Sequence, residues 1–131
     1  MEKINPESRI DKEVLGNICL HAEEAYPYEG CGVLLSKKGS EIVSGSVRAK
    51  NRVSGESAGT HFLLDPLEIY DIEKKAEDEG YDVAGFYHTH PEHEAIPSDE
   101  DKLYMIPEQL YLIVSVISGR CSDAALYIRK V

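Results

Sequence analysis

The most informative stretch of the sequence contains two histidines separated by one residue. His88 and His90 follow the apolar run 83–87, which predicts a buried strand, and Pro91 should end that strand. Residues two apart in an extended strand point to the same side. We therefore expect the two imidazoles to project together from the end of the strand.

A serine and a carboxylate follow the histidines. Ser98 is a typical helix N-cap residue, and Asp101 lies in the first turn of the helix that Ser98 would begin. The intervening loop is long enough to fold the carboxylate back onto the histidines. Two imidazoles and one carboxylate leave a fourth position for water, which is the pattern of a catalytic rather than a structural zinc site. Cobalt and iron accept the same ligands, so zinc is a chemical preference.

A zinc-activated water still requires a base, which takes its proton and passes it to the leaving amine. Glu29 is the candidate, because Gly30 and Gly32 beside it allow the backbone to approach a site closely. Ser98 offers a hydroxyl to the developing oxyanion. The structural alternatives are a solvated loop charge for Glu29 and a plain helix cap for Ser98.

This arrangement resembles the motif of the JAMM/MPN+ (JAB1/MPN/Mov34) zinc metalloprotease family. The motif here is His-x-His-Pro, followed after six residues by Ser and after two more by Asp, with a Glu upstream. The segment 28–35 resembles the Glu-bearing segment of that family. His61-Phe62 and Asp65-Pro66 resemble its lead-in to the second helix. The resemblance covers most of the chain and is closest to the small, stand-alone prokaryotic members.

The resemblance implies zinc ligation by His88, His90 and Asp101. It also implies general acid–base catalysis by Glu29 and stabilisation of the tetrahedral intermediate by Ser98. The implied fold is a cytidine-deaminase-like α/β sandwich, with a mixed β-sheet flanked by helices. The implied reaction is hydrolysis of a peptide or isopeptide bond after the C-terminal tail of a ubiquitin-like or sulfur-carrier protein, by a zinc-activated water. Such a tail can add as a strand at a sheet edge.

Two other functions stay open at this point. One is a non-catalytic, protein-binding scaffold of the MPN type, which the complete set of ligands disfavours. The other is a hydrolase of a small amide metabolite, which a closed pocket would favour over an open groove. Thr89 stands where many members have Ser, and we expect little effect because it should face away from the ligands. The long insertions of members specific for ubiquitin chains are missing, so selectivity for a chain linkage is not implied.

The elements that must position these residues follow from hydrophobic periodicity. Apolar residues step by four from Ile10 to Ala22, which predicts a helix that ends at Tyr26-Pro27. The polar loop 51–60 is a candidate flap over the site. Alternating helices and strands predict a mixed sheet with helices on its faces. The other expected elements are strands at 31–36, 41–50, 61–64, 83–87, 110–117 and 124–131, and helices at 65–79 and 98–106.

Composition limits the partners. The chain has 131 residues, with 14 Lys and Arg against 24 Asp and Glu, which gives a formal net charge of −10. We expect a single domain, 1–131. So acidic a chain would repel nucleic-acid phosphates and anionic membranes, and we expect neither as a partner. No apolar run approaches the roughly 20 residues that span a membrane, and no secretion signal is evident. The oligomeric state stays open.

Three cysteines, Cys19, Cys31 and Cys121, occur without a Cys-x-x-Cys pair. This odd, sparse count argues against a disulfide framework and predicts a reducing, cytoplasmic compartment. Cys31 lies between two glycines, and we expect a small buried residue there rather than a nucleophile. We expect His61 to be structural and His93 to lie on the surface or at the rim of the site.

Overall fold

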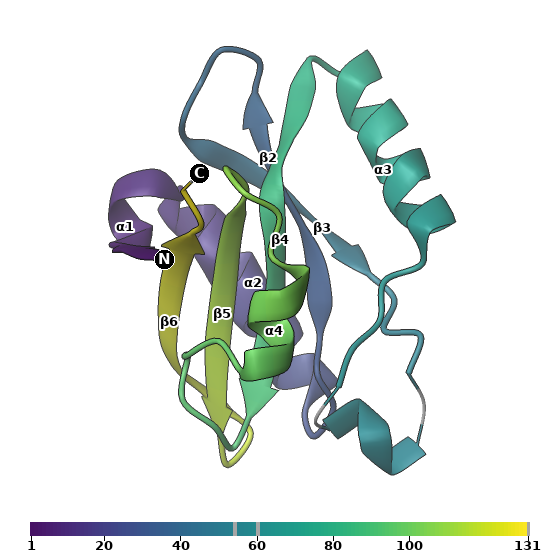
Figure 1. Ribbon diagram of the computed structural model, residues 1–131, viewed down its shortest axis with the longest axis vertical. Coiled ribbons are helices and arrows are strands. Elements are labelled where there is room, and N and C mark those ends of the chain that lie inside the picture. Colours follow the sequence, from purple (N-terminus) through teal and green to yellow (C-terminus); the bar gives the residue numbers. More distant parts are fainter. Residues whose placement is uncertain (54, 60, 131) are drawn as a thin grey trace.

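The computed structural model describes residues 1–53, 55–59 and 61–130, in which strands and helices alternate (Figure 1). The strands are β1 (Glu2–Ile4), β2 (Cys31–Lys37), β3 (Val43–Ala49), β4 (Tyr81–Pro91), β5 (Leu110–Ile117) and β6 (Arg120–Ile128). The helices are α1 (Pro6–Arg9), α2 (Lys12–Ala25), α3 (Pro66–Asp78) and α4 (Asp99–Tyr104), with a short 3₁₀ helix, η1 (Gly55–Gly59).

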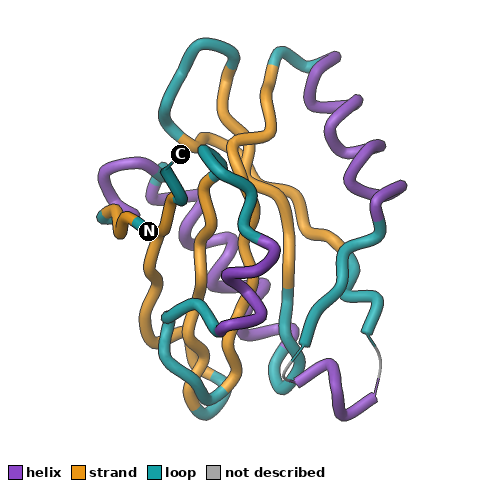
Figure 2. The backbone as a smooth tube through the Cα atoms, viewed as in Figure 1, coloured by secondary structure: helices purple, strands orange, loops and turns teal. Residues whose placement is uncertain are grey.

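The six strands form one mixed sheet in the order β1-β6-β5-β4-β2-β3. β4 and β5 run parallel, and the other neighbouring pairs are antiparallel. α2 lies behind this sheet and α4 in front of it, and the backbone tube shows the same layers (Figures 1 and 2). The expected mixed sheet flanked by helices is therefore confirmed.

α2 covers one face of the sheet. Val14, Ile18 and Ala22, spaced by four, are its buried residues, and they join an apolar cluster with Leu112 and Val114 of β5. Complete burial of such side chains contributes about 1.5–3 kcal/mol each. This packing fixes α2 on the sheet, and the C-terminal end of α2 leads directly into the segment that carries Glu29.

The opposite face is divided between two smaller clusters. Tyr111 and Ile113 alternate with the residues that face α2, so they point to the other side of β5. They pack with Met105, which follows α4. Further along the sheet, Ala76 of α3 packs on Val33 and its neighbours. The site lies on this second face, between the parts covered by α3 and α4.

Two glycines permit close approaches that place the histidine-bearing strand. A Cβ at Gly85 would collide with the carbonyl group of Leu110, where the parallel pairing of β4 and β5 begins. A Cβ at Gly32 would collide with the ring of Tyr87, which lies across β2. These contacts set the register of β4 against both neighbours, and that register determines where β4 ends.

Several predicted bounds change. β1 and α1 were not predicted, because three polar-flanked residues and a four-residue helix carry no measurable periodicity. β6 begins at Arg120 and α4 ends at Tyr104, a few residues from their predicted limits. β4 extends in both directions beyond 83–87 and includes the two histidines.

The strand predicted at 61–64 is wrong. In the structure the backbone of this segment bonds to the start of the 51–60 loop instead of to the sheet. The side chain of Asn51 donates to the His61 carbonyl and accepts from the Leu63 amide, and the Arg52 amide donates to the Leu63 carbonyl. The Asn51 side chain and the Arg52 amide therefore supply the hydrogen bonds that a neighbouring strand would have supplied.

The expectation about cysteines is partly wrong. Cys19 of α2 and Cys121 of β6 form a disulfide across 102 positions of sequence, because the packing of α2 on the sheet brings them together. Cys31 is a free, buried thiol as expected, and burial raises its pKa to about 12, which keeps it protonated and unreactive. Among the described residues, no helix is long and apolar enough to cross a membrane.

Candidate metal centre

His88 and His90 lie at the C-terminal end of β4 and point together to the face opposite α2. Tyr87, between β2 and α2, points the other way, as the alternation of a strand requires. The Nε2 atoms of the two histidines are 3.1 Å apart, and both side chains are buried. The predicted pair of imidazoles is therefore present in the structure.

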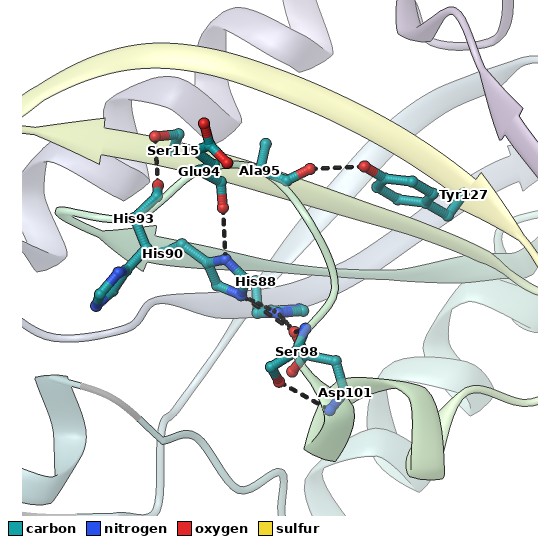
Figure 3. A network of polar contacts seen from close by, with 9 residues as sticks. All are labelled: His88, His90, His93, Glu94, Ala95, Ser98, Asp101, Ser115 and Tyr127. Carbon is teal, nitrogen blue, oxygen red and sulfur yellow. Dashed lines mark hydrogen bonds and ion pairs between the residues drawn. The ribbon is translucent and has the colours of Figure 1, made fainter.

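Asp101 joins the two histidines from α4. Its Oδ2 atom lies 3.1 Å from the Nε2 atoms of both His88 and His90, so the three donor atoms form a nearly equilateral triangle (Figure 3). The carboxylate is placed by a capping box: Ser98 Oγ accepts from the Asp101 amide, and the Ser98 amide donates to Asp101 Oδ2. The helix start thus delivers the carboxylate to the histidines.

The tautomer of His90 follows from its second nitrogen. His90 Nδ1 lies 2.8 Å from the carbonyl oxygen of Glu94, which can only accept, so Nδ1 carries the proton. In the neutral ring Nε2 then presents a lone pair toward Asp101 Oδ2, which also carries lone pairs. A cation between these atoms satisfies both of them, whereas a second ring proton satisfies them only in the charged imidazolium.

The spacing of the triangle matches that of a small divalent metal. Zinc bonds nitrogen and oxygen ligands at about 2.0–2.1 Å with tetrahedral angles, which places neighbouring ligand atoms about 3.3 Å apart. The observed separations of 3.1 Å need only a small outward movement. The donor set and its geometry therefore fit a small divalent metal ion such as zinc, and the carboxylate of Glu29 also lies within reach of the two histidines.

Burial by itself would raise the pKa of Asp101. The contacts with His88 and His90, together with the hydrogen bond from the Ser98 amide, outweigh that effect and hold the pKa of this carboxyl far below its usual range. A lowered pKa favours the ionised carboxylate, which is the form that binds a metal ion.

Glu29 is the second carboxylate of the site. It is only 6% exposed, and its carboxylate and the ligand nitrogens of His88 and His90 all lie within 4.8 Å of one another. Burial raises the pKa of Glu29 to about 7, while His90 opposes the shift and Asp101 adds to it. A carboxyl group with such a pKa can both take and give a proton near neutrality.

The backbone of Glu29 is held on both sides. Its amide donates to the Ala58 carbonyl of η1 at 2.6 Å, and its carbonyl accepts from the Asn51 side chain at 3.0 Å. η1 therefore contacts the backbone of Glu29 from within the predicted flap. Positions 54 and 60 of that flap lie outside the described residues.

Thr89 connects Glu29 to the histidine strand. Its hydroxyl accepts from the Gly30 amide at 2.8 Å, its own amide donates to the Gly30 carbonyl at 3.0 Å, and it is fully buried. The side chain is directed at Gly30 rather than at the ligands. Thr89 thus fixes the distance between the segment of Glu29 and the end of β4, a contact that sequence analysis did not anticipate.

Ser98 is exposed and combines two properties that the sequence left as alternatives. Its Oγ atom accepts the capping bond from Asp101, which leaves its hydroxyl proton free to donate elsewhere. It also lines a cavity of about 420 Å³ beside the triangle, together with Glu29, His61, His93 and Asp101. His93 therefore lies at the rim of the site. His61, which was expected to be structural, is exposed and lies at the rim as well.

A second cavity of about 340 Å³ adjoins the first and is largely apolar. Both are lined by Phe62, Glu100 and Asp101, and the second continues past His88 to the aromatic and aliphatic side chains of Leu64, Phe86, Tyr104, Met105 and Tyr111. Phe62 stacks on the His88 ring with 4.6 Å between centroids. The site is therefore an elongated, partly open cleft with one apolar arm.

Sequence analysis missed three groups that shape this site. The stacking of Phe62 had a weak signal, since His61-Phe62 belongs to the motif. The carbonyl of Glu94, which fixes the His90 tautomer, has no signal in a sequence, because every residue has a carbonyl group. Asn51 likewise gives no sign that its side chain bonds to both Glu29 and His61.

Comparison with known proteins identifies the family of this chain. Residues 11–127 match the family model for prokaryotic homologues of the JAB domain. A desampylase of Haloferax volcanii is 36% identical over 109 residues, which cover 76% of this chain and 73% of that protein.

Solved structures show the same fold. The solution structure of a Salinibacter ruber protein is 33% identical, covers 92% of this chain and 80% of its own, and superposes with a TM-score of 0.68. A JAMM structure, described as a metalloprotease-like zinc site in the proteasome and signalosome, is 21% identical. The match covers 93% of this chain and 87% of that one, with a TM-score of 0.55. The matched family and the desampylase together show that this chain belongs to the family of prokaryotic homologues of the JAB domain.

Proposed function

We propose that this chain is a zinc-dependent metallopeptidase that hydrolyses a peptide or isopeptide bond after the C-terminal tail of a ubiquitin-like or sulfur-carrier protein. The observation that carries the proposal is the triangle of His88, His90 and Asp101, with the buried carboxylate of Glu29 beside it. The similarity to a desampylase supports the choice of a modifier protein as substrate. The domain would extend over 1–131, and its proposed location is cytoplasmic.

In this proposal His88, His90 and Asp101 hold the metal ion. Zinc, when bound, acts as a Lewis acid that acidifies a water molecule and polarises the scissile carbonyl. Glu29 takes a proton from the attacking water and returns it to the leaving amine, for which a pKa of about 7 is well suited. Ser98 donates a hydrogen bond from its hydroxyl group to the oxyanion of the tetrahedral intermediate.

The shape of the cleft favours a protein tail over a small metabolite. A small amide would need a closed pocket, whereas two adjoining cavities here extend the site past the ligands on one side. The apolar arm, which contains Phe86, Tyr104 and Tyr111, suits an apolar side chain that precedes a narrow Gly-Gly terminus. The complete set of ligands and the buried Glu29 favour an enzyme over a scaffold.

The first test is the zinc content of the purified protein after incubation with zinc at neutral pH. We expect about one zinc per chain in the wild type and none in His88→Ala, because one ligand of three would be missing. Hydrolysis is then measured on a fusion in which a ubiquitin-like protein is joined through its Gly-Gly terminus to a reporter protein. A wild type without zinc would reject the metallopeptidase, whereas a zinc-loaded protein that leaves the fusion intact would reject this substrate class.

A further inference from the structure

Three consecutive backbone carbonyls between the histidines and α4 accept hydrogen bonds from side chains. The donors come from three adjacent strands, β4, β5 and β6, and Figure 3 shows them converging on this segment. The pairs are Ser115 Oγ with the His93 carbonyl at 2.6 Å, His90 Nδ1 with the Glu94 carbonyl at 2.8 Å, and Tyr127 OH with the Ala95 carbonyl at 2.7 Å. We refer to residues 93–95 as the carbonyl segment.

The two hydroxyl donors lie on the same face of the sheet as the metal ligands. Ser115 is the β5 partner of His90 in the parallel ladder, so their side chains stand next to each other. Tyr127 packs with Ala95 in the apolar cluster of that face. Ser115 and Tyr127 are 3% and 8% exposed, so water has little access to replace their hydrogen bonds.

The carbonyl segment has no helix or strand of its own, so side chains supply its hydrogen bonds. Its central carbonyl, that of Glu94, bonds to His90 and fixes which nitrogen of the ring carries the proton. The carbonyls on either side are held by Ser115 and Tyr127. Without these two hydroxyls, the Glu94 carbonyl would depend on His90 for its own position, and it could not orient the ring.

We infer that Ser115 and Tyr127 are positioning residues for the metal centre. They hold the carbonyl segment so that Glu94 orients His90, and in this way they determine how tightly the triangle of His88, His90 and Asp101 binds a divalent metal ion. Groups that orient metal ligands typically change metal affinity by about 10–100-fold when they are removed. The inference rests on the metal site proposed above and assigns it two residues outside its motif.

The test uses Zn²⁺ affinity, measured by competition with a chromophoric chelator on the metal-free protein. The variants are Tyr127→Phe, Ser115→Ala and the double variant. Each removes one or both hydroxyl donors, and Tyr127→Phe keeps the packed ring. We expect the Zn²⁺ dissociation constant of the double variant to rise about 10–100-fold, and those of the single variants to rise by smaller factors.

Tyr87→Phe is the matched control. It also removes one buried tyrosine hydroxyl, which lies 2.7 Å from His21 Nδ1, but on the face of the sheet that α2 covers. We expect this control to lower the thermal midpoint of the metal-free protein as much as Tyr127→Phe does and to leave Zn²⁺ affinity unchanged. The visible spectrum of the Co²⁺ form reports on ligand geometry, and we expect it to change in the double variant but not in Tyr87→Phe.

The inference would be overturned if the double variant bound Zn²⁺ as tightly as Tyr87→Phe does. It would also be overturned if the Co²⁺ spectrum of the double variant were the same as that of the wild type. If the double variant does not fold, the two single variants decide by the same criteria. A wild type that binds no Zn²⁺ would refute the proposed metal site and this inference with it. A wild type that binds Zn²⁺ as tightly as the double variant refutes only the inference.

Discussion

The two faces of the sheet are held together in different ways. On the face covered by α2, a continuous apolar cluster packs Ile18 and Ala22 against strand residues such as Leu112. On the other face, the apolar contacts are split into two clusters, and the space between them is occupied by the histidines and by hydrogen bonds to backbone carbonyls. Cohesion on the first face is non-directional, whereas on the second it depends on individual donors and acceptors.

This difference separates stability from chemistry. Apolar packing tolerates small displacements, because its energy depends on area rather than on angles. A metal triangle does not tolerate them, because its donor atoms must stay within a few tenths of an ångström of their positions. Changes on the α2 face should therefore lower stability and spare activity, whereas changes on the histidine face should lower activity or metal affinity even where they also cost some stability.

The largest effect is expected for Glu29→Gln. The amide keeps the size of the side chain but cannot take a proton from water, so kcat should fall by about 10²–10⁴-fold. Zinc content should stay at the wild-type level, because Glu29 is not one of the three proposed ligands. The measurement combines the rate on the Gly-Gly fusion with elemental analysis, and full activity in the variant would remove Glu29 from the mechanism.

Ser98→Ala tests the two properties of Ser98. It removes the helix cap, at a cost of about 0.5–2 kcal/mol, and it removes the oxyanion donor, which should lower kcat by about 10²–10³-fold. Ser98→Asp is the matched control, since Asp caps a helix but has no hydroxyl proton to donate. We expect Ser98→Asp to recover the stability of the wild type but not its kcat. If both recovered, Ser98 would act only as a helix cap.

Leu112→Ala probes the α2 face. The side chain is fully buried, and its truncation should lower the free energy of unfolding by about 2–5 kcal/mol. The rate per folded molecule and the zinc content should not change. Chemical denaturation gives the free energy of unfolding, and the rate at saturating substrate gives the activity. A loss of zinc in a folded Leu112→Ala protein would contradict the division between the faces.

Thr89→Val sharpens the comparison, because position 89 belongs to the histidine strand but its side chain turns away from the ligands. The change leaves the buried Gly30 amide without its acceptor, which should cost about 1–3 kcal/mol of stability. We also expect kcat to fall by a smaller factor than in Glu29→Gln, since Glu29 would lose part of its anchoring. Thr89→Ser keeps the hydroxyl and should restore both quantities; equal behaviour of Val and Ser would show that the contact with Gly30 is dispensable.

The same division explains what could be predicted from the sequence. The α2 helix and the core strands follow from the spacing of apolar residues, of which the step from Val14 to Ile18 is an example. The histidines, Asp101 and Ser98 were found because their residue types and spacing are unusual, and Glu29 was found from its flanking glycines and the family resemblance of its segment. The structure brings all five to one cleft.

Other features had no pattern from which they could be predicted. The strand expected at 61–64 failed because Asn51 satisfies that backbone from outside the sheet. The disulfide between Cys19 and Cys121 depends on tertiary packing between elements 102 positions apart. The carbonyl segment uses main-chain atoms, which are the same in every residue, so only coordinates reveal it.

The parallel pairing of β4 and β5 has a consequence for which parts of the chain can vary in length. Antiparallel neighbours can be joined by a turn of two residues, but parallel strands need a connection of about a dozen residues or more, because the chain must return across the sheet. In this fold the connection is 92–109, and it carries the carbonyl segment, Ser98 and Asp101. The topology therefore sets a minimum length for the part of the chain that completes the site. Deletions within this crossover would therefore strain the sheet and the metal centre together.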